Sequence, residues 1–197
     1  MFTGIIETTG TVSEIISCGS NKSFWVESSL SHELKIDQSI NHDGVCLTVE
    51  ELREHSHKIT AIEETLTKTN LNNWKPNQRI NMERCVPVTG RLEGHIVQGH
   101  VDTKSQCLKR KSRHGSWEFE FELPEKYFAI LVEKDSISVN GISLTAFKVK
   151  RKSFRVAIIP YTFDHTCISE IYVGNSVNLE FNIIGKYINR FLTVNKK

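Results

Sequence analysis

The chain has 197 residues, of which 39% are hydrophobic and 24% charged, and its formal net charge is +2. These values are ordinary for a globular protein. So small a positive charge argues against a dedicated nucleic-acid-binding protein, which needs a basic excess to neutralise phosphates.

Short β-branched and apolar segments, separated by polar or turn residues, follow one another through the first half. They predict strands at residues 10–16, 23–27, 38–40, 45–52 and 58–62. Residues 64–72 are polar enough for a short helix or loop beside these strands. Proline and glycine then interrupt the pattern at 87–90, which marks the link between two halves.

The second half repeats this rhythm. Strands are predicted at residues 117–123, 136–139, 142–149, 154–159 and 176–181, with a short helix or loop at 162–172. A basic run at 109–114 precedes Gly115 and is typical of a solvated hairpin tip, with an anion contact as the alternative. Evenly spaced short strands without long helices predict an all-β barrel or sandwich.

The last segment has a different period. Its apolar residues recur every three or four positions and share one helix face: Tyr187, Ile188, Phe191, Leu192 and Val194. An apolar helix at the end of a β-protein needs a surface to cover. That surface is either the chain's own barrel or the same helix of another subunit, which would build an oligomer.

A duplication organises the whole chain. The sequence Asp-Gly-Val-Cys-Leu-Thr at 43–48 returns as Asn-Gly-Ile-Ser-Leu-Thr at 140–145, 97 residues later. Two further pairs match at that offset, 64–66 with 161–163 and 81–83 with 178–180. A constant register indicates a duplicated domain. We therefore predict domains at 1–90 and 91–185 and a C-terminal helix at 186–197; two similar domains can hold two similar molecules.

The repeated motif places small polar side chains on one face of a strand. Cys46 and Thr48 point to one side and Leu47 to the other, because alternate residues of a strand share a face. The glycine that precedes each motif allows a tight turn or the close approach of a flat ligand. The paired strands are therefore either curved strands with small residues or the walls of two related pockets.

The two copies differ at one titratable position. Residues 4–7 align with 99–102 at an offset of 95, so a small insertion lies before the later motifs. The first copy has Ile5 where the second has His100. An imidazole serves as acid or base near neutral pH, and an isoleucine does not, so two like sites would play unlike roles. The alternative is a surface histidine bonded to a neighbouring strand.

Several other features are expected to be absent. The five cysteines are scattered without a Cys-x-x-Cys pair, which indicates reduced thiols and no zinc site. His95 and His100 are five residues apart, which suits no common metal motif. The first residues lack a signal peptide's pattern, and no apolar run is long enough to span a bilayer. We expect a cytoplasmic protein without a metal, nucleic-acid or membrane partner.

Six motifs in order resemble the riboflavin synthase family, and the match extends over the whole chain. They lie at residues 1–7, 44–48, 94–102, 141–145, 159–162 and 184–187. The resemblance implies two tandem six-stranded Greek-key β-barrels and a homotrimer assembled through C-terminal helices. It also implies the conversion of two 6,7-dimethyl-8-ribityllumazine molecules into riboflavin and 5-amino-6-ribitylaminouracil, with no cofactor. Association with lumazine synthase is left open.

The resemblance also implies which residues bind and react. His100 and Ser143 are similar to the family's proton-handling pair, Thr145 and Cys46 support them, and Phe2 closes the site. The expected N-terminal site comprises Gly4, Ile5, Ile6, Cys46, Leu47, Thr48, Thr60, Ala61, Ile62, Glu63, Glu64 and Thr65. The expected C-terminal site comprises Gly99, His100, Val101, Lys134, Ser143, Leu144, Thr145, Ala157, Ile158, Ile159, Pro160, Tyr161 and Thr162.

Some positions depart from the family pattern. Asn182 stands where the family commonly has an aspartate implicated in catalysis, and Asp135 stands where glycine is usual. Asp43 and Asn140 look exchanged between the two domains. The main alternative function is a non-catalytic protein that holds lumazine or flavin as a chromophore. Such relatives tend to lose the second-domain motif, which is present here.

Overall fold

The first half of the chain forms a closed barrel. The computed structural model describes residues 1–195. The six strands pair antiparallel in the order β1-β2-β5-β4-β3-β6, so that β2 and β5 are neighbours although two strands separate them in sequence. This is the expected Greek-key barrel. Its strands are β1 (Thr8–Cys18), β2 (Asn21–Glu27), β3 (Ser39–His42), β4 (Val45–Arg53), β5 (Ser56–Ala61) and β6 (Arg79–Arg84).

The second barrel repeats the first in topology. Its strands close in the equivalent order, β7-β8-β11-β10-β9-β12. β7 begins 95 residues after β1, whereas β9 begins 97 residues after β3, so the expected small insertion lies between β8 and β9. The strands are β7 (Thr103–Arg113), β8 (Ser116–Glu122), β9 (Ser136–Val139), β10 (Ile142–Lys150), β11 (Ser153–Ile158) and β12 (Ser176–Phe181).

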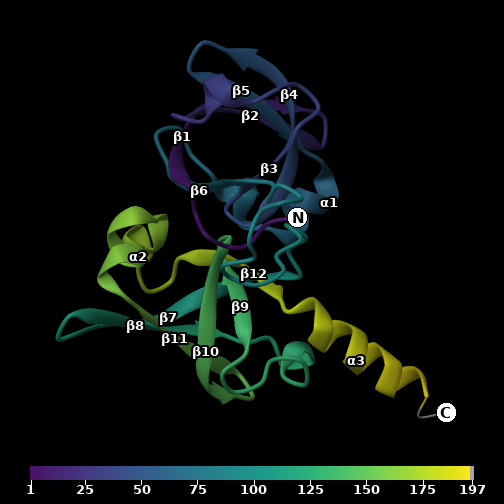
Figure 1. Ribbon diagram of the computed structural model, residues 1–197, viewed down its shortest axis with the longest axis vertical. Coiled ribbons are helices and arrows are strands. Elements are labelled where there is room, and N and C mark those ends of the chain that lie inside the picture. Colours follow the sequence, from purple (N-terminus) through teal and green to yellow (C-terminus); the bar gives the residue numbers. More distant parts are fainter. Residues whose placement is uncertain (196–197) are drawn as a thin grey trace.

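Each barrel encloses its own core. Ile40, Ile59 and Ile80 are fully buried in the first barrel, and the residues 97 positions later are fully buried in the second. Every second residue of a strand points inward, which places apolar side chains inside and polar side chains outside. Figure 1 shows the two barrels as separate bodies that meet along one side.

Short helices follow the fifth strand of each barrel, where a helix or loop was expected. α1 (Glu63–Lys68) continues into the 3₁₀ turn η2 (Asn70–Asn73), and α2 (Pro160–His165) continues into η4 (Cys167–Glu170). Thr69 and Thr166 interrupt them, because each is extended and its hydroxyl accepts a backbone N–H of the following turn. Two further 3₁₀ turns are η1 (Ser31–Glu33) and η3 (Glu125–Tyr127).

Strands β6 and β7 were absent from the strands predicted by pattern. β7 ends in the basic run 109–113, and these charged residues interrupt the apolar pattern by which a strand is predicted. The run leads into the hairpin turn that joins β7 to β8, as expected. Arg110 is an exception within it, because its guanidinium donates to the carbonyls of Ser169 and Ile171 at 3.0 Å.

The barrels touch where their repeated motifs begin. Gly44 and Gly141 both have positive φ, and a Cβ on either would lie within 3 Å of the other's backbone nitrogen. Only glycine fits such an approach. The two glycines therefore serve contact between the barrels, and the close approach of a flat ligand to them stays a prediction.

The C-terminal helix starts earlier than predicted and leaves the barrel. α3 (Ile183–Val194) begins three residues before the expected position, because the Asn182 side chain accepts the Ile184 N–H and caps it. None of its residues is buried, and Figure 1 shows it projecting away from the second barrel. The prediction that the apolar face of this helix packs on the chain's own barrel is therefore wrong. Of the predicted segment, residues 196–197 lie outside the described part.

Candidate functional site

The repeated motifs present the predicted side chains on the outside of the barrels. On β4, Cys46 is half-buried and Thr48 exposed, whereas Leu47 points into the core. Ser143 and Thr145 occupy the same positions on β10, with Leu144 turned inward. The predicted alternation is confirmed, and each barrel carries an equivalent polar strip.

The loops that meet these strips come from the opposite repeat. The N-terminal segment runs antiparallel to the interdomain segment, with Phe2 and Val97 exchanging backbone hydrogen bonds of 2.7 and 3.1 Å. The Ser143 N–H then donates to the Gly4 carbonyl at 2.8 Å, and the Cys46 N–H donates to the Gly99 carbonyl at 2.9 Å. Gly4 therefore lies at the second barrel and Gly99 at the first.

These contacts correct the expected grouping, which assigned each loop to the strand motif of its own repeat. Ile5 and Ile6 belong beside Ser143, and His100 and Val101 belong beside Cys46. The packing agrees, because Ile6 contacts the core of the second barrel and Val101 that of the first. The physical reason is the crossing of two extended segments before each enters its own first strand, which no repeat pattern encodes.

The contact between loop and strand requires glycine. Gly4 and Gly99 have φ of 78° and 79°. A Cβ on Gly4 would lie 2.6 Å from the Ser143 Cβ, and a Cβ on Gly99 would lie 2.6 Å from the Cys46 Cβ. Both the left-handed conformation and the close approach exclude larger residues. The Phe2 ring is fully buried and lies beneath Gly99.

Two glutamates hold these loops, and the sequence reasoning gave them no role. The Glu180 carboxylate accepts the N–H groups of Gln98, Gly99 and His100 at 2.7–3.0 Å. Burial raises its pKa, and these bonds oppose that rise. The shared triplet at 81–83 and 178–180 was the signal that could have identified both glutamates.

Glu83 does the same for the other loop. Its carboxylate accepts the N–H groups of Thr3 and Gly4 and the Thr3 hydroxyl at 2.6–3.0 Å. Burial also raises its pKa. Each loop is therefore fixed from the last strand of one barrel while it reaches the strip of the other.

His95 is the third functional residue without a predicted role. Its Nδ1 lies 2.7 Å from the Ser143 Oγ. The imidazole is buried, and burial lowers its pKa, so the neutral form is favoured. A neutral imidazole bonded to a hydroxyl is a proton acceptor. His95 was considered only as a metal ligand, although it lies in the motif at 94–102.

The remaining predicted residues flank the strips. Residues 60–65 span the end of β5 and the start of α1, and residues 157–162 span the equivalent join of β11 and α2. Ile159 and Tyr161 are exposed, and the Tyr161 ring stacks on His165 at 4.0 Å. Lys134 is exposed in a left-handed conformation before β9.

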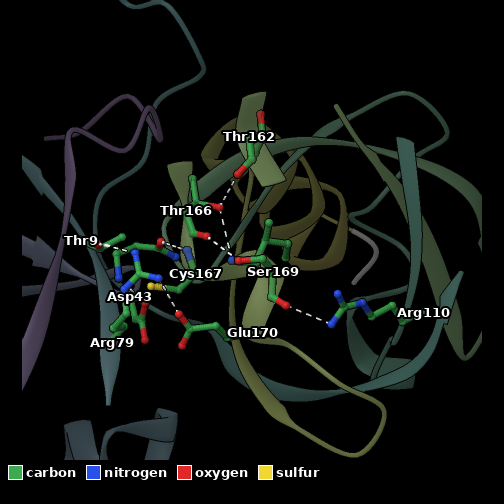
Figure 2. A network of polar contacts seen from close by, with 11 residues as sticks. Thr9, Asp43, Arg79, Arg110, Thr162, Thr166, Cys167, Ser169 and Glu170 are labelled. Atoms are coloured by element: carbon green, nitrogen blue, oxygen red, sulfur yellow. Dashed lines mark hydrogen bonds and ion pairs between the residues drawn. The ribbon is translucent and has the colours of Figure 1, made fainter. Parts of the chain in front are cut away.

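A separate cavity of about 520 Å³ lies between the barrels, and none of the predicted site residues lines it. Its wall includes buried Asp43 and the ion pair of Arg79 with Glu170, whose closest atoms are 2.8 Å apart. Figure 2 shows Arg79 held also by Thr9, at 2.9 Å. Arg79 is therefore already paired, and Lys75 is a second basic residue of the cavity wall.

Neither a metal centre nor a membrane span is present in the described residues. Residues 1–195 contain no group of three or more potential ligand side chains. Within the same residues, no helix has the length and apolar character needed to cross a bilayer.

Comparison with known proteins agrees with this arrangement. A family model for the lumazine binding domain matches residues 3–85 and 98–182, one match for each barrel. The chain is 37% identical to a riboflavin synthase of Photobacterium phosphoreum, covering 100% of this chain and 91% of that protein. It is 33% identical to a riboflavin synthase of Bacillus subtilis, covering 98% and 90%.

Solved structures share the fold. LumP complexed with 6,7-dimethyl-8-(1'-D-ribityl) lumazine superposes with a TM-score of 0.84 at 15% identity, covering 91% of this chain and 98% of that one. LumP complexed with riboflavin gives 0.86 at 16% identity, covering 92% and 99%. Fold and family model together define a protein with two lumazine-binding domains. The chain belongs to the riboflavin synthase family, and it is an enzyme of the transferase class.

Proposed function

We propose that this protein converts two molecules of 6,7-dimethyl-8-ribityllumazine into riboflavin and 5-amino-6-ribitylaminouracil. One lumazine donates a four-carbon unit and an identical molecule accepts it. The observation that carries the proposal is the pair of equivalent strips, each completed by the opposite repeat's loop. A reaction between two copies of one substrate requires two similar sites that hold the copies in reactive orientation.

The two sites differ in the groups that they offer. The first-barrel site has the Cys46 thiol, and His100 directly follows Gly99, whose carbonyl accepts the Cys46 N–H. The second-barrel site has the Ser143 hydroxyl with His95. The reaction needs a base for the C7 methyl of one lumazine and a nucleophile for C7 of the other. We assign the base to the His95–Ser143 pair, with Thr145 as support. His100 and Cys46 act on the facing molecule, and Phe2 supports the Gly99 loop.

The sites face outward, so a complete active site needs a second copy. The α3 helix offers the surface for it, because Ile184, Tyr187 and Phe191 are all more than half exposed. An exposed apolar helix of this kind is stable when it packs against its equivalents around an axis. We propose a homotrimer in which the first barrel of one chain faces the second barrel of the next.

The second candidate is a protein that holds lumazine without converting it. LumP shares the fold and is complexed with lumazine, riboflavin or flavin mononucleotide in solved structures. The presence of Ser143 and Thr145 in the second barrel, with His95 of the interdomain segment beside them, favours the enzyme. A binding protein needs no proton acceptor beside its ligand.

The two candidates are separated by supplying dimethylribityllumazine as the sole substrate. The proposal predicts riboflavin and 5-amino-6-ribitylaminouracil in equal amounts. Absorbance and chromatography measure the two products. His100→Gln is expected to slow turnover while the oligomer stays intact, and His114→Gln, in the exposed hairpin turn, is the control. Tight binding without product would favour the chromophore candidate.

A further inference from the structure

The first turn of α3 is fixed to the second barrel through the motif at 184–187. A Cβ on Gly185 would lie 2.9 Å from the Ile130 carbonyl oxygen, so a larger residue there would displace the backbone. The next residue, Lys186, is half-buried, and its Nζ lies 2.9 and 3.0 Å from the two carboxylate oxygens of Asp102. The helix that projects from the second barrel in Figure 1 therefore starts from a fixed base.

Asp102 joins this base to the loop that carries His100. Its Oδ2 accepts the Phe181 N–H at 2.9 Å, and its own N–H donates to the Leu179 carbonyl at 2.9 Å. Glu180, the residue between these two, accepts the His100 N–H at 3.0 Å. Positions 100 and 102 are therefore both held by three consecutive residues of β12, and a single residue separates them in the chain.

The first repeat has an equivalent carboxylate but a different cation. Glu7, at the position that aligns with Asp102, accepts the Arg84 N–H at 2.7 Å and also pairs with the Arg84 guanidinium at 2.7 Å. The residue equivalent to Arg84 is the buried Phe181, which carries no charge. In the second repeat the cation comes from α3 instead, so the ion pair links the His100 loop to the helix.

We propose that Lys186 is a positioning residue, which through Asp102 fixes the end of the loop that presents His100 to the first-barrel site. His100 is exposed, so its backbone anchors set its position. Without Lys186, the Asp102 carboxylate, whose side chain is only 18% exposed, would be a poorly solvated charge without its cation. It would turn toward water and release the loop. The catalytic consequence rests on the proposed function, whereas the anchoring of the loop does not.

Amide hydrogen exchange measured by NMR tests the anchor without turnover. Lys186→Met should speed the exchange of the Gly99 and His100 amides by about tenfold, because the loop opens more often. Lys186→Arg keeps the charge and should return the exchange to near the wild-type rate. Arg151→Met is the matched control, since it breaks the exposed pair of Arg151 with Glu125, whose atoms are 2.7 Å apart. Lys186→Gln replaces Lys186→Met if that variant does not fold, with the same direction expected.

A double-mutant cycle tests whether Lys186 acts through Asp102. Asp102→Asn keeps an oxygen for the Phe181 N–H but removes the charge, so adding it to Lys186→Met should accelerate the exchange little further. In turnover, kcat of Lys186→Met should fall about tenfold while KM stays close to wild type, because His100 is misplaced relative to bound substrate. Unchanged exchange in Lys186→Met, or accelerations that multiply in the double variant, would overturn the proposal.

The outcomes separate the anchor from the reaction. Faster exchange in a protein whose wild type makes no riboflavin supports the anchor and rejects the proposed reaction. Unchanged exchange in a variant with normal turnover rejects the anchor and leaves the proposed reaction intact. Faster exchange with an unchanged kcat, in an enzyme that is active, confines Lys186 to a structural role and also overturns the proposal.

Discussion

Asn81 and Asn178, 97 residues apart, make the same hydrogen bonds in opposite directions across the contact between the barrels. The Asn81 amide donates to the Asn140 carbonyl at 2.9 Å and accepts the Cys167 N–H at 2.7 Å. Asn178 donates to the Asp43 carbonyl at 2.8 Å and accepts the Asn70 N–H at 2.7 Å. Each asparagine lies on the last strand of its barrel and satisfies buried backbone groups of the other.

The first prediction follows from this exchange. Asn178→Ala leaves the Asp43 carbonyl and the Asn70 N–H without these partners, and an unsatisfied buried group is costly. We expect the free energy of unfolding to fall by about 2–5 kcal/mol. Urea denaturation measures the change, and Asn72→Ala, at an exposed position of η2, is the control. A loss no larger than the control's would show that the barrels do not depend on this contact.

The second prediction concerns Asp43, which is buried at the same contact. Burial raises its pKa to about 7, so the folded state holds a proton that the unfolded state, with a pKa of 3.8, releases. Stability from this group is therefore present at acid pH and lost as pH rises from about 4 to 7. Full ionisation at higher pH costs on the order of 4 kcal/mol.

Asp43→Asn should remove this dependence. Asn140 occupies the equivalent position, where its side-chain oxygen accepts the Asn178 N–H just as Asp43 accepts the Asn81 N–H. We expect the variant to be more stable than wild type at pH 8 and to gain much less at pH 4. Denaturation midpoints of the variant and wild type, measured at pH 4 and at pH 8, test this expectation. An equal gain at both would contradict an ionisable origin.

The third prediction addresses the loop that carries His100. Glu180→Ala removes the acceptor of three backbone N–H groups, each a charge-assisted bond. The loop would lose its fixed position, and kcat/KM should fall roughly tenfold or more. The kcat/KM of Glu180→Gln, which keeps one acceptor oxygen, should lie between those of wild type and Glu180→Ala. Glu122→Gln, at the exposed end of β8, is the control; an unchanged kcat/KM in Glu180→Ala would contradict the role of the loop.

The fourth prediction concerns assembly. Phe191 is 69% exposed on α3, and a charge there would disrupt an apolar helix contact. Phe191→Glu should convert a trimer into monomers and abolish turnover, while thermal unfolding of the barrels stays close to wild type. Sedimentation gives the mass. Arg190→Ala, a neighbouring exposed position, is the control; a trimeric and active Phe191→Glu would place the subunit contact elsewhere.

Much of the fold was predictable because it depends on local pattern. The alternation of Cys46, Leu47 and Thr48 placed the polar strip on the outer face, and the constant offset of 97 indicated two equivalent barrels. Strand β7 was missed because basic residues, of which Arg110 is half-buried, occupy both faces of its end, which leaves no apolar alternation to recognise. The start of α3 was missed because it depends on a cap at Asn182.

The candidate site was less predictable because its parts come from different repeats. Sequence placed Gly4 near Cys46 by membership of the same repeat, whereas the crossing of the two extended segments places it at Ser143. The partnership of His95 with Ser143 likewise depends on a contact 48 positions apart in the chain. Asp135 and Asn182 were recognised as separate departures, and only their hydrogen bond relates them.

The central claim is that one active site is built from the first barrel of one chain and the second barrel of another. Thr48→Arg and Thr145→Arg each block one strip, at equivalent exposed positions, and each variant alone should be inactive. Co-expressed with different tags and purified as mixed trimers, they should recover about a third of wild-type turnover, since one of the three sites in each mixed trimer pairs two intact halves. Mixed trimers no more active than the parent variants, under conditions where wild type is active, would contradict a site shared between chains.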